Sequence, residues 1–289
     1  MANVKFCYPN WTLATPTVTP TITGAGWLDL ANLQGEVLSE TARYPGVTPA
    51  NTKLLIDLGT LRNLSVLAIP IHNAGLLDTA RIRVATDAGL TNIVLDTGWQ
   101  EFFGEMYPYG SLPWGRVEWT DGRYNAEQAA GKTPTWVFVS PVEVIGRYLD
   151  VQLDFSNNAS GVVDIGQIVA SPALTPKYNI SYGVNPPYYK DPSQANRSKG
   201  GVRFADKYRP YRTTQMRLDW LDESEAYGQF FDMARDYGIT KPFLFIYDAS
   251  AARSILTKHT MMATAEKIGE PTHPHFGVYS MTIELSEAF

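Results

Sequence analysis

The chain has 289 residues, a length that accommodates two domains of ordinary size. Its formal net charge of −5 argues against a general nucleic-acid-binding protein, which would show a basic face. Its single cysteine, Cys7, excludes an intrachain disulfide and favours a reducing compartment.

Residues 1–23 are rich in proline and threonine. Proline cannot donate to a β-ladder, so the segment is typical of an edge strand or an extended loop. Two interpretations stay open: an N-terminal extended arm that lies on a neighbouring subunit, or a first strand with irregular flanks. We expect no signal peptide, because no basic region precedes an apolar run. We expect no membrane span, because no apolar stretch approaches about 18 residues.

Residues 24–180 carry short apolar or alternating segments separated by turn residues, without a long helical pattern. In one of them, Ile82 and Val84 alternate with Arg81 and Arg83, which is the period of a half-buried strand. Such segments predict a β-sandwich. The expected strands are 53–58, 64–72, 80–86, 93–96, 135–139, 148–155 and 162–170.

The periodicity fails between residues 99 and 136, where aromatic residues mix with glycine and proline. Loops of such length are usually functional, or they hide short elements. Exposed aromatic side chains would suit a glycan-binding face or a protein interface. A satellite cluster packed on the sandwich is an equal alternative. The candidate contact residues for a ligand or partner are Trp99, Tyr107, Tyr109, Trp114 and Trp119.

Residues 181–210 are predicted as a linker, because they hold Pro186-Pro187 and Gly200-Gly201 among polar residues. The segment is locally basic in an acidic chain. That charge could meet an acidic partner surface or nucleic acid, or it could be solvated on a loop.

Residues 211–289 are predicted to form an α+β unit, with one helix packed on a small antiparallel β-sheet. The segment 214–220 alternates, which places Met216, Leu218 and Trp220 on one face of a strand. Further strands are expected at 243–247, 259–268 and 279–285.

The helix of this unit carries sequence signals at both ends. Asp222 and Glu225 have the spacing of a capping box. Apolar residues then recur at helical spacing from Ala226 to Ala234, which indicates one buried stripe. Gly238 stands where a left-handed residue would end the helix.

No catalytic constellation stands out. His273 and His275 suggest a metal, but no other His or Cys supplies further ligands at a recognisable spacing. Asp57 and Asp154 could form a glycosidase pair, although sequence does not define their separation. We therefore expect no catalytic residue, no metal site and no cofactor, and a glycan-cleaving enzyme remains a third hypothesis.

Five segments of the first domain resemble the discoidin, or galactose-binding-like, jelly roll. The last two are similar to forms of that module in virion proteins of tailed bacteriophages. The resemblance implies a jelly-roll β-sandwich over residues 24–180 whose end loops bind sugars or other partners. The segments are WLDLANL at 27–33, LIDLG at 55–59, AIPIHN at 68–73, DIGQI at 164–168 and SPAL at 171–174.

The element order of residues 211–285 resembles the C-terminal part of tail-tip proteins of long-tailed (siphovirus-like) bacteriophages. The strings that carry the resemblance are DWL at 219–221 and FLFI at 243–246. Proteins of that family share a tail-tube-like fold that assembles into rings around the DNA channel. This chain departs from many distal tail proteins because its sandwich comes first, which leaves its position in the tail open.

Together the resemblances imply a structural virion protein, a distal or minor tail protein of the tail tip that is assembled in the host cytoplasm. Its C-terminal domain would self-associate into a ring, expected to be a hexamer, and its outer sandwich would hold fibres or contact the host surface. The implied partners are the tube, hub and fibre proteins, and DNA would pass through the lumen without specific binding. The alternative is a carbohydrate-binding adhesin that recognises a bacterial surface glycan.

Overall fold

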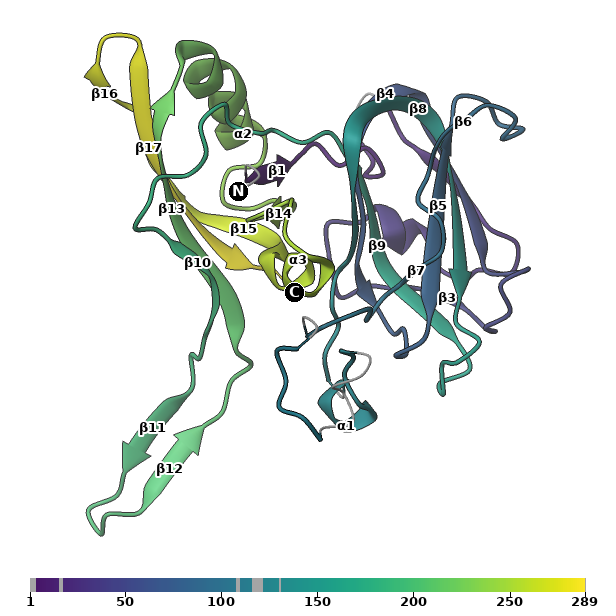
Figure 1. The fold of residues 1–289 in the computed structure, drawn as a ribbon, viewed down its shortest axis with the longest axis horizontal. Coiled ribbons are helices and arrows are strands. Elements are labelled where there is room, and N and C mark those ends of the chain that lie inside the picture. The colour runs from purple at the N-terminus through teal and green to yellow at the C-terminus, as the bar shows by residue number, and fades with distance from the viewer. Residues whose placement is uncertain (1–3, 16–17, 108–109, 116–121, 130, 289) are drawn as a thin grey trace. The chain divides into compact units, whose positions relative to one another are not determined.

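The computed structural model describes residues 4–15, 18–107, 110–115, 122–129 and 131–288 (Figure 1). Contacts divide the chain into two compact units. The larger unit comprises residues 1–175 and 243–260, and the smaller unit comprises 176–242 and 261–288. Among the helices in the described ranges, none has the length and apolar character that crossing a membrane requires.

The larger unit contains an antiparallel β-sandwich, as the alternating segments predicted. Two short helical elements, η1 (Leu30–Gln34) and α1 (Ala126–Ala129), lie in its loops. Its strands are β2 (Thr21–Thr23), β3 (Ala42–Tyr44), β4 (Lys53–His72), β5 (Thr79–Ala85), β6 (Ile93–Asp96), β7 (Gln100–Glu101), β8 (Trp136–Asp154) and β9 (Val163–Ser171).

Strands β4 and β8 bend, so that each contributes to both layers of the sandwich (Figure 1). The first half of β4 pairs with β2 and with the second half of β8. The second half of β4 pairs with β9 and with the first half of β8. Gly59 lies where the register of β4 against β8 shifts, between Asp57 and Arg62, and its φ of 77° favours glycine. The sequence predicted two separate strands in each of these stretches, and the structure joins them.

The sandwich core is built from the alternating residues of these strands. Ile82 and Val84 are fully buried, as predicted, and burial stabilises each such side chain by about 1.5–3 kcal/mol. Arg81 and Arg83 point away from this core. The guanidinium of Arg83 contacts the carboxylate of Asp150, with Nε 2.9 Å from Oδ2.

The described part of the N-terminal segment holds two short strands that pair within the same chain, and its role as an arm on a neighbouring subunit stays a prediction. Strand β1 (Lys5–Cys7) pairs with β14 (Phe243–Ile246). The ring of Phe6 packs on Phe245, with centroids 5.4 Å apart. Strand β1 is what the alternative interpretation, a first strand with irregular flanks, expects. Burial raises the pKa of the Cys7 thiol to about 12, which leaves it unreactive.

The smaller unit is built on an antiparallel sheet in which β13 lies between β10 and β17, and β17 lies between β13 and β15. Strand β16 also pairs with β17. The strands are β10 (Asn185–Lys190), β11 (Gln194–Arg197), β12 (Arg203–Asp206), β13 (Tyr211–Leu221), β15 (Thr260–Ile268), β16 (Thr272–His275) and β17 (Val278–Glu287).

The helical segment of this unit comprises a π-helix, η3 (Ser224–Phe230), followed by α2 (Phe231–Asp236). The predicted capping box is present. Glu225 N donates to Asp222 Oδ1 at 2.9 Å, and Asp222 N donates to Glu225 Oε2 at 3.1 Å. Gly238 adopts the predicted left-handed conformation after the helix, with a φ of 53°.

The predicted alternation of β13 holds for Met216 and Leu218, which are buried, and then fails. The register between β13 and β17 shifts between Leu218 and Leu221. Leu221 therefore takes the buried position, and the prediction that Trp220 shares the face of Met216 is wrong.

The predicted linker is largely strand. Strand β10 joins the sheet beside β13, and β11 and β12 form a hairpin that projects from it (Figure 1). Residues 243–260, which the sequence assigned to the C-terminal domain, group with the larger unit. They contain a helix that was not predicted, α3 (Arg253–His259).

Candidate binding surfaces

Three of the five predicted contact residues are described, while Tyr109 and Trp119 lie outside the described residues. Trp99 and Trp114 are on the surface, where the two residues are 46% and 85% exposed. Tyr107 instead packs edge-on against Tyr124, with ring centroids 5.5 Å apart. For Tyr107 the structure therefore matches the satellite-cluster alternative, and for the exposed tryptophans the contact role stays a prediction.

A cleft of about 810 Å³ lies between three loops of the larger unit. Most of its lining comes from the end of β4 and the loop after it (residues 72–77), from residues between 123 and 133, and from the loop after β8 (residues 157–159). Because these segments are far apart in the sequence, no local pattern predicted that they form one site.

His72 holds two of these segments together beneath the cleft. Its Nδ1 accepts a hydrogen bond from Ala74 N at 3.1 Å, and its Nε2 lies 2.9 Å from Pro134 O, to which it donates. Its ring packs on Phe102, with centroids 4.3 Å apart. Burial lowers the pKa of His72 to about 4. The neutral ring supplies the one acceptor and one donor that these partners require.

The buried carboxylate of Asp78 joins the first loop to the third. It accepts hydrogen bonds from Gly75 N at 2.6 Å and from Asn157 N at 3.3 Å. Burial raises the pKa of Asp78. Asn158 adds a second connection, because its Nδ2 donates to Asn73 O at 2.8 Å. The cleft is therefore held by buried polar contacts, which favours a preformed site over a loose loop surface.

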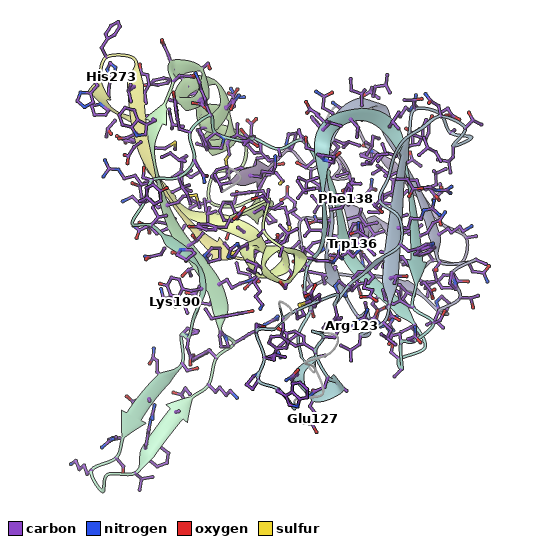
Figure 2. The ribbon with its side chains drawn as sticks, viewed as in Figure 1. Arg123, Glu127, Trp136, Phe138, Lys190 and His273 are labelled. Atoms are coloured by element: carbon purple, nitrogen blue, oxygen red, sulfur yellow. The ribbon has the colours of Figure 1, made fainter. Side chains whose placement is uncertain are left out.

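The cleft wall combines aromatic, amide and cationic groups. The ammonium of Lys132 lies 4.6 Å from the centre of the Tyr124 ring. Arg123 donates to Glu101 Oε1 at 2.7 Å, and it precedes α1, which carries Glu127 (Figure 2). The side chain of Asn157 is exposed at the rim. An aromatic face beside amide groups suits a small polar ligand such as a sugar.

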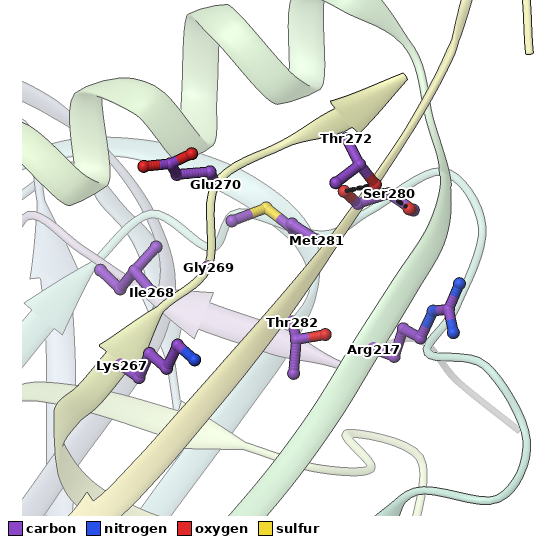
Figure 3. Close-up of a pocket in the computed structure, with 9 residues that line it drawn as sticks. All are labelled: Arg217, Lys267, Ile268, Gly269, Glu270, Thr272, Ser280, Met281 and Thr282. Carbon is purple, nitrogen blue, oxygen red and sulfur yellow. Dashed lines mark hydrogen bonds between the residues drawn. The ribbon is translucent and has the colours of Figure 1, made fainter. Parts of the chain in front are cut away.

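A shallow groove of about 490 Å³ lies on the sheet of the smaller unit (Figure 3). Gly269 N donates to Thr282 O at 2.8 Å, and a Cβ at Gly269 would lie 2.8 Å from the same oxygen. Arg217, on the groove wall, is paired with Asp219 at 2.5 Å. Charges of both signs and several hydroxyls line the groove, which defines no particular ligand chemistry.

The projecting hairpin is a third surface. We call residues 190–210 the exposed hairpin, because every residue of β11 and β12 is exposed. Val202, Phe204 and Tyr208 each expose more than half of their surface. A two-stranded hairpin without a core is marginally stable in water. This surface is therefore suited to contact with a partner.

Asp57 and Asp154 cannot act as a glycosidase pair. Asp57 lies opposite Tyr148 in the β4–β8 pairing, and Asp154 is six residues further along β8. At about 3.3 Å per residue their separation is roughly 20 Å, twice the largest distance in such pairs. Asp57 instead binds Arg147 at 2.7 and 2.9 Å, and this contact lowers the pKa of Asp57.

The two histidines near the C-terminus show no metal-site arrangement. His273 stacks on Tyr279, with ring centroids 4.6 Å apart, and its Nε2 accepts from Gly277 N at 3.2 Å. Across the described ranges, no three His, Cys, Asp or Glu side chains are grouped as a metal ion would require.

No protein-family model and no curated protein sequence match the chain. Similar solved structures include a module described as CpGH89CBM32-6 of Clostridium perfringens, with 14% identity over 56% of this chain and 98% of that one, and a TM-score of 0.33. CBM32-1 from a family 31 glycoside hydrolase of Clostridium perfringens is 12% identical over 53% of this chain and 94% of that one, with a TM-score of 0.32.

A further similar structure is the CBM32 of AlyQ in complex with 4,5-unsaturated mannuronic acid. It is 13% identical over 52% of this chain and 92% of that one, with a TM-score of 0.33. Since all three TM-scores are below 0.5, the similarity carries no functional argument.

Proposed function

We propose that this chain is a structural protein of a bacteriophage tail tip, a distal or minor tail protein. Its smaller unit assembles with copies of itself into a ring around the DNA channel, and its sandwich serves for fibre attachment or contact with the host surface. The observation that carries this proposal is the exposed hairpin. The resemblance of residues 211–285 to tail-tip proteins supplies the context.

The hairpin exposes both of its faces. In the part of the chain that the structure describes, no sheet or helix covers its two strands, and every residue of both is exposed. Phe204 exposes 61% of its surface in this position. Apolar side chains on a projecting ribbon gain free energy when a partner covers them, at about 25 cal/mol per Å². If such a contact repeats from copy to copy, the copies form a ring when the rotation between neighbours brings the last copy back to the first.

The test is the mass and shape of the purified protein, by light scattering and negative-stain electron microscopy. Rings with a central opening are the expected result. A chain that stays monomeric over a wide range of concentrations would contradict the assembly role, and tight binding of oligosaccharide by that monomer would favour an adhesin.

A second candidate function is carbohydrate binding by the sandwich, and the cleft under the Tyr124 segment favours it. The cleft offers an aromatic ring, the exposed side chain of Asn157 and a preformed floor. Such binding is compatible with a tail-tip protein that contacts a bacterial surface glycan, and also with a separate adhesin. Enzymatic activity is not part of either proposal.

A glycan array followed by calorimetry tests this candidate. Asn157→Ala and Tyr124→Ala address the cleft, and Trp99→Ala and Trp114→Ala address the aromatic residues predicted from the sequence. If the cleft binds sugar, only the two cleft variants weaken the affinity for the glycan, by about tenfold or more. Weakening by the tryptophan variants alone would assign the site to the aromatic-rich stretch. Absence of binding to every glycan would contradict the candidate function.

A further inference from the structure

We propose that the exposed hairpin of one copy docks on the acidic helical segment of the next copy, in a head-to-tail contact. We define the acidic helical segment as residues 222–236, which contain η3 and α2. The inference rests on the proposed assembly role of the smaller unit, and it names the two surfaces that meet.

Opposite charges on the two surfaces are the first argument. The exposed hairpin holds six Lys or Arg residues and two Asp residues. The acidic helical segment holds five Asp or Glu residues and one Arg. Four of these acids, Asp222, Glu223, Asp232 and Asp236, are exposed. Complementary surfaces of this kind steer association and fix its register.

The arrangement of charge within the hairpin is the second argument. Arg197 and Arg203 lie directly opposite each other in the β11–β12 pairing. Like charges in this position destabilise a hairpin. Within the ranges that the structure describes, neither guanidinium forms an ion pair with a carboxylate. Carboxylates of a docked partner would remove this repulsion.

Apolar side chains on both surfaces are the third argument. Tyr227 and Phe231 of the acidic helical segment, and Trp220 just before it, expose half or more of their surface. Tyr227 packs edge-on against Tyr279, with ring centroids 5.3 Å apart, so its ring is held in place. Aromatic anchors surrounded by charges are typical of protein interfaces. Phe204 of the hairpin is a matching anchor.

The hairpin cannot reach the acidic helical segment of its own chain. Strand β13, Tyr211–Leu221, connects the two, and its 11 residues span about 36 Å at 3.3 Å per residue. The two surfaces therefore lie at opposite ends of this strand (Figure 1). The contact requires a second copy, and since its two sides differ, repetition produces a ring or a filament.

Charge reversal in the full-length chain tests the contact. One variant carries Arg197→Glu and Arg203→Glu, and the other carries Glu223→Lys and Asp236→Lys, which leaves the capping box intact. Each variant alone should self-associate at least about tenfold more weakly than the wild type in sedimentation velocity at low salt. An equimolar mixture should regain association, because each reversed surface then meets an oppositely charged partner.

Lys53→Glu, at an exposed position of β4, is the control, and its self-association should match that of the wild type. Circular dichroism checks that each variant is folded, and rescue in the mixture shows that both variants keep a competent surface. Unchanged association of both reversal variants overturns the docking contact while the assembly role stands. A wild-type chain that remains monomeric at low salt overturns both.

Discussion

Trp220 and Leu221 are neighbours in β13 with opposite environments: Trp220 is 60% exposed and Leu221 is 2% exposed. Because the register against β17 shifts between Leu218 and Leu221, Leu221 and not Trp220 faces the core. Leu221→Ala should lower the free energy of unfolding by about 2–5 kcal/mol, because it leaves a cavity in the core. Trp220→Ala is the matched control and should change it by less than about 0.5 kcal/mol. Urea unfolding followed by circular dichroism measures both, and a larger loss for Trp220→Ala would contradict the assignment.

The capping box offers a second prediction. Asp222→Ala removes the acceptor for Glu225 N and should destabilise the smaller unit by about 1 kcal/mol. Glu223→Ala, one residue further, is the control, because Glu223 is exposed and is not a member of the box. Thermal unfolding of both variants gives the comparison, and equal melting temperatures would show that the cap contributes nothing.

The environment of His72 predicts a pH dependence of stability. Its pKa is about 4 in the folded chain and about 6.5 when unfolded. Between these values the unfolded state binds more protons, so stability is complete above pH 6.5 and is lost as the pH falls towards 4. The difference between the two pKa values corresponds to a loss of about 3 kcal/mol in the free energy of unfolding. Urea unfolding at several pH values measures the slope.

A His72→Asn variant is the control for this slope, since other groups also titrate in the same range. It should be less stable than the wild type at pH 7, where it loses contacts to Ala74 and Pro134. Its stability should fall less steeply below pH 6.5. If both chains show the same slope, His72 is not responsible for the pH dependence.

Excision of the hairpin separates folding from assembly. Lys190 and Tyr211 are paired across β10 and β13, so an Asn-Gly turn can replace residues 191–210. The shortened chain should remain folded, with a melting temperature within a few degrees of the wild type. It should not assemble, as light scattering would reveal. Normal assembly without the hairpin would remove the observation on which the assembly proposal rests.

The sequence predicted those strands that bury one face, and it predicted both ends of the helix. Ile82, Val84 and Met216 are core residues whose alternation is visible in the chain, and Asp222 with Glu225 marks the helix start. The sequence did not predict the hairpin, because a ribbon that is exposed on both faces does not need alternating apolar and polar residues. Nor did it predict the cleft, whose position depends on tertiary contacts between distant loops.

The bend that carries β4 and β8 through both layers has a mechanical consequence for the sandwich. A sandwich whose layers share no strand can separate along the plane between them while each layer keeps its hydrogen bonds. Here the same two strands cross that plane, so the backbone itself joins the layers at the bends of β4 and β8, and the layers cannot separate as two independent sheets. Amide hydrogens of both layers should therefore exchange with solvent in one cooperative opening.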